Sequence, residues 1–234
     1  MSAIVYLIPT VLHEGRTECL PAYILEAVKQ CSVLFVENER TARRYLKLLA
    51  REIVINDFEW FNMKDVTAET TAAFRQKIGE KKIIGIISEA GCPGIADPGQ
   101  QLVAIAQQMG VQVKPLVGPN SILLALMASG MNGQQFQFVG YLPIDNGERA
   151  KMIKTLEQES RHKNSTQIFI ETPYRNNQLL ETLTKTCLPQ TLICVAVDLT
   201  ADTEKVQTKT AQQWKTAMPN LHKHPAIFLL YAGT

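Results

Sequence analysis

The chain lacks the cysteine patterns that are typical of secreted, disulfide-bonded proteins and of zinc-binding proteins. The 234 residues include five cysteines, none of them in a C-x-x-C pair: Cys19, Cys31, Cys92, Cys187 and Cys194. An odd number of isolated cysteines argues against a disulfide framework or a zinc ribbon and favours free thiols in a reducing compartment. We therefore expect a cytoplasmic protein.

Long apolar runs and strong charge are also lacking. The longest apolar stretches, such as 121–128 and 226–232, fall well short of the roughly 20 residues that a membrane-spanning helix needs. The first residues lack the pattern of a signal peptide, so we expect neither a leader nor a membrane partner. A net charge of +2 neither requires nor excludes a nucleic-acid partner.

Several common catalytic and cofactor motifs are absent as well. The chain has no G-x-G-x-x-G, no H-E-x-x-H and no G-x-S-x-G, and residues 94–101 have P-loop glycine spacing without its Lys and Ser/Thr. The segment HKHP (222–225) could bind a stray metal ion, although an exposed basic turn is the favoured interpretation. We expect no metal centre.

What the chain does have is a regular alternation of strand-like and helix-like segments, which predicts an α/β protein with mostly parallel sheets. Strands are predicted at 3–8, 32–37, 52–55, 82–88, 111–116, 166–171, 191–197, 205–210 and 226–231. Helices are predicted at 20–30, 39–50, 66–79, 100–109, 121–129, 147–160, 174–186 and 211–217. The polar, Gly-rich segment 129–143 is interpreted as a hinge, which predicts two domains, 1–135 and 136–234.

The segment SEAGCPGIADPG (88–99) is the densest cluster of glycine and proline. It stands between a predicted central strand and a predicted helix. In open α/β sheets, ligands bind beyond the carboxyl ends of the strands, so we expect this loop to hold a ligand.

Six segments, in order, resemble the tetrapyrrole methylase superfamily, and the resemblance covers nearly the whole chain. They are ENERTARRYLKLL (37–49), the long block at 88–131, FVGYLPIDNGERAKMI (138–153), IFIETPYR (168–175), VAVDLTADTE (195–204) and PAIFLLY (225–231). Within the superfamily the chain looks most like the branch that methylates a ribose hydroxyl in small-subunit ribosomal RNA.

The resemblance implies two α/β domains with S-adenosylmethionine bound in the cleft between them, and a homodimer. The loop at 88–99 then cradles the methyl donor, because its small residues let the backbone approach a ligand closely. By their positions in the family motifs, the donor-binding residues are expected to be Leu12, Gly91, Cys92, Pro93, Ile95, Ser121, Ile122, Leu142, Thr172, Ala196, Val197 and Pro225. Leu12, Ile95, Ile122 and Ala196 could equally be ordinary core residues.

Glu37 and Arg40 are the predicted catalytic pair. Glu37 follows a predicted strand at the carboxyl edge of the sheet and is the candidate base for a ribose hydroxyl, with Asp97 and Glu171 in reserve. Arg40 is the candidate cation that favours the alkoxide, although an ion pair with Glu37 or Glu39 is equally possible. Arg40, Arg44, Lys47 and Arg51 are spaced to share one helix face, which can guide an RNA backbone or simply be solvated.

Departures from the ribosomal branch leave the methyl acceptor open. The segment 197–204 lacks the Arg, Lys and His that the branch usually carries there, and Asn38 and Glu39 also differ from its pattern. Three hypotheses stand: a ribose methyltransferase acting on ribosomal RNA, a methyltransferase for a tetrapyrrole or other small molecule, and a relative that binds the donor or RNA without turnover.

Overall fold

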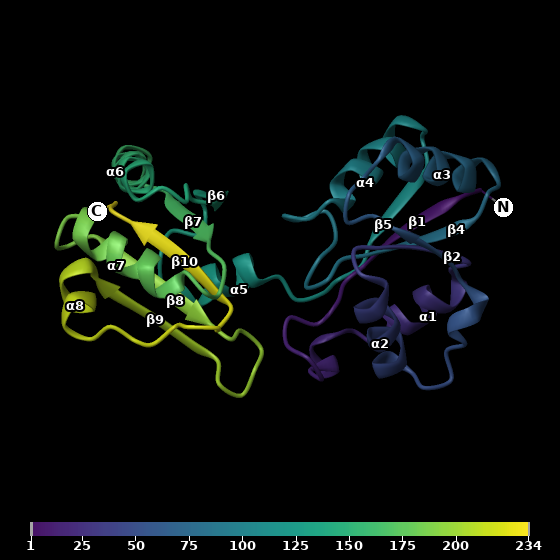
Figure 1. The fold of residues 1–234 in the computed structure, drawn as a ribbon, viewed down its shortest axis with the longest axis horizontal. Coiled ribbons are helices and arrows are strands. Elements are labelled where there is room, and N and C mark those ends of the chain that lie inside the picture. Colours follow the sequence, from purple (N-terminus) through teal and green to yellow (C-terminus); the bar gives the residue numbers. More distant parts are fainter. Residues whose placement is uncertain (1, 234) are drawn as a thin grey trace. The chain divides into compact units, whose positions relative to one another are not determined.

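The computed structural model describes residues 2–233 of the chain, which divide into unit 1, up to Asn120, and unit 2, from Ser121 onward (Figure 1). Unit 1 has five strands, β1 (Ile4–Ile8), β2 (Val33–Val36), β3 (Glu59–Asn62), β4 (Ile83–Ile87) and β5 (Gln112–Pro115). Its helices are α1 (Tyr23–Gln30), α2 (Glu39–Leu49), α3 (Ala68–Gly79) and α4 (Gly99–Gln108).

The sheet of unit 1 is entirely parallel, with the strand order β3-β2-β4-β1-β5. The helices α1 and α2 cover one face and α3 and α4 the other, so that alternate strand residues enter two separate cores (Figure 1). Val36, Leu34 and Ile8 lie on the α1/α2 side, and Phe35 and Ile84 on the α3/α4 side. Burial on both faces explains why these strands are apolar throughout.

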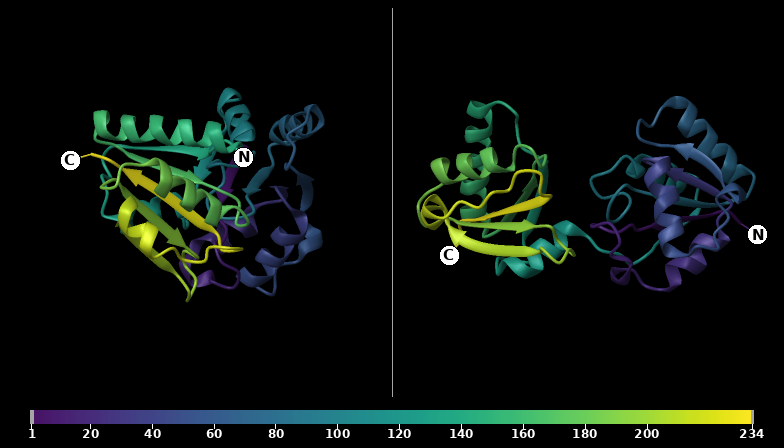
Figure 2. Two further views of the ribbon diagram at one scale, coloured as in Figure 1. Left: turned by 60° about the vertical axis from the view of Figure 1, so that its left-hand side comes forward. Right: turned by 60° about the horizontal axis from the view of Figure 1, so that its bottom comes forward.

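Unit 2 also has five strands, β6 (Phe136–Tyr141), β7 (Thr166–Ile170), β8 (Leu192–Val197), β9 (Lys205–Thr210) and β10 (Ala226–Tyr231). Its helices are α5 (Ser121–Ser129), α6 (Asn146–Lys163), α7 (Asn176–Thr186) and α8 (Ala211–Thr216). One core, centred on Phe169, Phe228 and Trp214, joins the sheet to α6, α7 and α8. Figure 2 shows the long helix α6 lying along this sheet.

The expectation of mostly parallel sheets is wrong for unit 2. Its strand order is β6-β7-β10-β8-β9, and only the β6–β7 pair is parallel. Apolar alternation reports burial and carries no information about strand direction, which is why the sequence pattern did not separate the two sheets.

The division between the units comes earlier in the chain than the boundary expected after residue 135. The helix α5 accounts for the difference, because it packs against β8, β9 and β10 and so belongs to unit 2. The predicted hinge at 129–143 contains the strand β6, and the predicted strand at 52–55 is irregular backbone followed by a short 3-10 turn, Ile55–Asp57.

The helix ends follow local side-chain chemistry. Asn38 begins α2 by accepting hydrogen bonds from the backbone N–H groups of Arg40 and Thr41, and Asp145 caps α6 in the same way. Asn164 ends α6 in the left-handed conformation, with φ 48°. Among residues 2–233, no helix is both long enough and apolar enough to cross a lipid bilayer.

Candidate functional site

The strands β1 and β4 are neighbours at the centre of the unit 1 sheet, and the helices that follow them lie on opposite faces. The loops after the two strands, 9–16 and 88–98, therefore diverge around a crevice at the carboxyl edge. Such a switch point is where open parallel sheets bind ligands. The predicted donor loop therefore lies at the edge where the topology places a ligand site.

The two loops are joined by hydrogen bonds. The Thr10 backbone N–H donates to the Gly91 carbonyl over 2.8 Å, and the Thr10 hydroxyl donates to the Ser88 carbonyl over 3.4 Å. Both Thr10 and Ser88 are buried. Sequence reasoning did not identify either residue, because nothing in their spacing marks a threonine and a serine as partners across 78 positions.

Gly91, in the second of these loops, is packed tightly against Leu12 and Pro119. Its φ is +74°, and a Cβ on it would lie 3.3 Å from Leu12 Cδ2 and 3.4 Å from the Pro119 carbonyl oxygen. Leu12 and Gly91, predicted separately as donor contacts, are thus neighbours. Gly118 is more restricted still, because a Cβ there would lie 2.1 Å from Pro9 Cβ. The turn VGPN (117–120) is therefore packed directly on the end of β1.

Cys92 ties the donor loop to the same turn. Its thiol donates to the carbonyl oxygens of Gly118 and Pro119, at 3.6 and 3.4 Å from Sγ. Burial raises the pKa of the Cys92 thiol above its ordinary value. The neutral, hydrogen-bonded thiol positions the loop and is poorly suited to act as a nucleophile.

Asp97 closes the donor loop at the start of α4. Its Oδ1 accepts hydrogen bonds from the backbone N–H groups of Gly94 and Gly99, at 2.9 and 2.8 Å. Its Oδ2 is buried and accepts no hydrogen bond from any described residue. Burial raises the pKa of the Asp97 carboxyl, and the two backbone hydrogen bonds counteract part of that rise.

Glu37 lies directly after β2, at the same carboxyl edge. Its Oε2 accepts a hydrogen bond from the Glu89 backbone N–H over 2.9 Å, which fixes the carboxylate beside the donor loop. Its charge also contributes to the raised pKa of Asp97, so these two carboxyl groups are close enough to interact. The Oε1 atom of Glu37 has no hydrogen-bond partner among residues 2–233.

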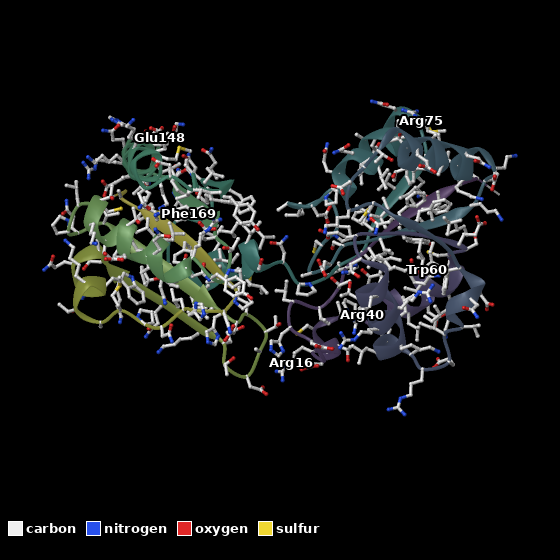
Figure 3. All side chains as sticks on the ribbon, viewed as in Figure 1. Arg16, Arg40, Trp60, Arg75, Glu148 and Phe169 are labelled. Carbon is white, nitrogen blue, oxygen red and sulfur yellow. The ribbon has the colours of Figure 1, made fainter. Side chains whose placement is uncertain are left out.

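Arg40 lies at the exposed start of α2 (Figure 3). The alternative in which Glu37 or Glu39 neutralises it is wrong, because Glu39 pairs with Arg43 and Glu37 binds the Glu89 backbone. The Arg40 guanidinium has no partner in the described part of the chain. It remains available to an anionic ligand.

The basic face predicted on α2 is mostly occupied. Arg44 pairs with Glu14 at 2.5 Å, and Lys47 donates to the carbonyl oxygens of Arg51 and Ile53. Arg51 lies beyond Leu49, where the helix ends, and does not share its face. These contacts favour a structural role for Arg44 and Lys47 and leave Arg40 as the member of the predicted helix face that is open to a ligand.

A pocket of about 180 Å³ opens in unit 1 beside this edge. Its wall combines the loop after β1, the middle of α2 and residues 88–90. Leu12, Ala42 and Leu48 supply apolar surface, while Arg44 and Glu89 supply charge. One predicted donor contact, Leu12, therefore borders a real cavity within unit 1.

The donor contacts predicted in unit 2 gather at one edge of its sheet. The strands β6, β7 and β8 end at this edge and the antiparallel β10 begins there, as the pairs Tyr141↔Ile170 and Ala226↔Val197 show. Leu142, Thr172, Val197 and Pro225 stand at or next to these strand ends. Ser121 and Ile122 form the start of α5, which packs on the same sheet.

Four predicted donor contacts could also be core residues, and their burial divides them into two buried residues and two that are at least partly exposed. Ile122 and Ala196 are buried, whereas Ile95 is 51% exposed and Leu12 is half-buried. Ile95 and Leu12 are therefore not core residues, and a surface contact explains them better. Pro93 is buried in the donor loop, and Pro225 is exposed.

Glu171, the second reserve base, is held in place just before Thr172. Its Oε1 accepts hydrogen bonds from Arg175 at 2.7 Å and from the Thr172 backbone N–H at 2.6 Å. The Glu171 side chain is 1% exposed, and its Oε2 is buried without a described partner. Among residues 2–233, no group of three metal-ligating side chains is found.

Comparison with known proteins identifies relatives along most of the chain. The family described as Tetrapyrrole (Corrin/Porphyrin) Methylases matches residues 15–214. A protein of Halalkalibacterium halodurans named ribosomal RNA small subunit methyltransferase I is 27% identical over 176 residues, which are 75% of this chain and 57% of that protein. A Vibrio cholerae protein of the same name is 30% identical over 205 residues, 87% of this chain and 67% of that protein. The chain spans about 60% of the length of the curated relatives it matches.

The fold is shared with solved structures at lower identity. The methyltransferase CobJ has a TM-score of 0.64 and 17% identity, over 98% of this chain and 93% of that one. This likeness confirms the expected α/β fold.

Proposed function

The chain belongs to the tetrapyrrole methylase family, and from this premise we propose that it transfers a methyl group from S-adenosylmethionine to a ribose hydroxyl of small-subunit ribosomal RNA. The observation that carries the proposal is the site at the carboxyl edge of the unit 1 sheet. There a closely fitted glycine loop, a fixed carboxylate and an unpaired arginine occur together. The names of the ribosomal relatives support the choice of acceptor.

The residues of the donor loop fit S-adenosylmethionine in two respects. Gly91, with φ +74° and close packing against Leu12 and Pro119, lets the loop follow a tight path at the carboxyl edge, where a ligand can meet its backbone groups. The buried Oδ2 of Asp97 can accept a hydrogen bond from an amine or hydroxyl of a bound molecule.

When bound, S-adenosylmethionine supplies a methyl group on an electrophilic sulfonium. In unit 1, Leu12, Gly91, Cys92, Pro93 and Ile95 are proposed to hold it. In unit 2 the proposed contacts are Ser121, Ile122, Leu142, Thr172, Ala196, Val197 and Pro225.

The proposed base is Glu37. Its Oε2 is held by the Glu89 N–H, which leaves Oε1 to take the proton of the ribose hydroxyl. The proposed electrostatic partner is Arg40, whose unpaired guanidinium can stabilise the developing alkoxide or bind a neighbouring phosphate. Positioning supplies most of the rate in such a displacement, because the acceptor oxygen must approach in line with the methyl group.

We also propose that the chain acts as a homodimer. Leu123 and Met127 lie one helical turn apart on α5 and are 47% and 78% exposed. An apolar pair of this kind suits contact with a second copy. Light scattering should give the mass of a dimer, and Met127→Glu should shift it toward the monomer.

The test of the proposed function is transfer of labelled methyl groups from S-adenosylmethionine. Small ribosomal subunits from a strain that lacks the gene serve as acceptor, with small-molecule extract in parallel. Label in ribosomal RNA supports the proposal. Label confined to the extract indicates a small-molecule acceptor, and tight donor binding without label indicates a relative that does not turn over.

A further inference from the structure

The loop 220–224, between α8 and β10, presents three polar side chains that the proposed donor site does not use. His222, Lys223 and His224 are all exposed. Tyr174 lies beside them, with its ring 5.8 Å from that of His222 and 70% of the residue exposed. We call the loop 220–224 together with Tyr174 the platform.

The platform is fixed to the start of α7. The buried Asn176 donates from Nδ2 to the His224 carbonyl over 2.7 Å, and Asn177 Oδ1 accepts the Leu221 N–H over 2.7 Å. The Lys223 N–H donates to the Pro173 carbonyl over 3.0 Å. These hydrogen bonds hold the backbone of the exposed loop in place, so the positions from which its side chains project are set before any ligand arrives.

Two backbone positions in and beside the platform are strained. Lys223 has φ 67° and Asp198 has φ 50°, in the left-handed region that residues other than glycine rarely occupy. Strain of this kind persists where the surrounding structure enforces it. For Lys223, the hydrogen bond from its backbone N–H to the Pro173 carbonyl helps to hold the conformation.

Asp198 orients the His224 ring. Its Oδ2 lies 2.8 Å from His224 Nδ1 and accepts the Thr203 hydroxyl over 3.0 Å. With Nδ1 engaged, Nε2 is the ring nitrogen that can meet a ligand. A cavity of about 210 Å³ adjoins the pair and is lined by His224, Asp198 and Lys205.

We propose that the platform binds a single-stranded segment of the acceptor RNA, with one base stacked on Tyr174 and a phosphate at Lys223. This inference rests on the proposed function. An exposed aromatic ring beside cations is how proteins bind unpaired RNA, since every base has a flat face and every linkage a charge. Charge alone would serve an acidic peptide or a lipid surface, whereas the exposed ring is the component that a base requires.

The experiment measures binding of a short, unstructured, fluorescent RNA to the full chain by anisotropy. Tyr174→Ala should weaken binding about tenfold, and Tyr174→Phe should stay within about twofold of the original protein, because phenylalanine retains the stacking face. Lys223→Asn removes the charge and keeps a residue that tolerates positive φ. It should lower the salt dependence of binding by about 0.7 in log–log slope.

Lys81→Asn is the matched control. Lys81 is also an exposed lysine in the left-handed conformation, with φ 58°, and it belongs to unit 1. Its replacement should change neither affinity nor salt dependence. Calorimetry with S-adenosylmethionine checks that each variant keeps its donor affinity and hence its fold.

The outcomes separate this inference from the proposed function. Wild-type affinity in Tyr174→Ala, or equal effects of Lys81→Asn and Lys223→Asn, overturns the platform. Equal weakening of heparin and RNA binding by Tyr174→Ala also overturns it, because heparin has no bases to stack. If the original protein methylates ribosomal subunits in any of these cases, the proposed function stands without the platform. If it neither binds RNA nor methylates subunits, both proposals fail.

Discussion

Unit 1 and unit 2 each contain a five-stranded sheet packed against helices, but the two sheets bring different parts of the chain to the edge where the predicted site residues lie. In unit 1 every strand ends at that edge, so the site is built from loops that follow strands, such as 9–16 and 88–98. In unit 2 the antiparallel strand β10 begins at the edge and brings the residues that precede it, Pro225 and the loop 220–224 of the platform. The direction of a strand therefore decides whether the residues before it or the residues after it lie at the site.

The largest expected effect tests whether the chemistry belongs to the edge of unit 1. Glu37→Gln should lower turnover by about 100-fold to 10,000-fold while leaving donor affinity intact, because the amide can still accept the Glu89 N–H but cannot take a proton. Single-turnover experiments measure the rate of methyl transfer, and calorimetry measures the affinity for S-adenosylmethionine. Glu171→Gln is the matched change in unit 2, and a larger loss there would reassign the base.

Core truncations compare how firmly the two sheets are packed. Phe35→Ala in unit 1 and Phe228→Ala in unit 2 remove fully buried rings, and each should cost about 3–5 kcal/mol. Phe35 should cost more, because it stacks on Phe61 at 4.7 Å and meets Phe74 edge-on at 5.0 Å, whereas Phe228 has Phe169 at 6.2 Å. Hydrogen exchange resolved by segment measures the stability of each sheet separately. Equal losses of stability in the two variants would contradict the ranking.

A smaller effect tests the close approach at the switch point of unit 1. Gly118→Ala should destabilise the protein by about 1–3 kcal/mol and weaken donor binding, because its Cβ would overlap the Pro9 ring. Gly79→Ala is the control, since a Cβ there meets nothing within 4 Å. Thermal unfolding measures the stability, and calorimetry measures the affinity for S-adenosylmethionine. Donor affinity that is unchanged in Gly118→Ala would separate the turn from the site.

The smallest effect concerns pH. The pKa of Asp97 is raised in the folded protein, so the folded state binds its proton more tightly than the unfolded chain does. Its contribution to stability is therefore complete below the unfolded pKa of about 4 and declines as pH rises through the folded value. In Asp97→Asn this decline should be absent. Urea unfolding across this range measures it, and parallel pH profiles for the two proteins would refute it.

The sequence predicted most of the helices and strands of both units, but it predicted the strand directions correctly only in unit 1. Continuous apolar runs marked β1, β2 and β4, and the Gly/Pro cluster after β4 marked the loop at the switch point. The strand β3 was missed because its four residues, EWFN, end in polar groups, and β6 was hidden among glycine and glutamine. Hydrogen bonds between distant residues, such as Thr10 with Ser88, leave no local pattern from which they could be predicted.

The basic helix shows a second limit of sequence reasoning. Spacing placed Arg44 and Lys47 on one face, but it could not show that Glu14 and the carbonyl groups of residues 51 and 53 already occupy them. Arg149, which follows the expected hinge, is 1% exposed and donates hydrogen bonds to the Ile144 carbonyl and the Thr182 hydroxyl, so a charged residue in a polar segment is buried here. Charge on a surface is countable from sequence, but its availability depends on tertiary contacts.

The central place of β1 has a consequence for synthesis. The strand β1 pairs with β4 and β5, which end at Ile87 and Pro115, so it has no sheet partner until those later residues leave the ribosome. At about 5–20 residues per second, the wait is roughly 5 to 20 seconds. Throughout that time an apolar strand with two unpaired edges is exposed, which is the condition that favours aggregation. A nascent chain of this protein should therefore depend on chaperones early, and that dependence should end once β5 has emerged.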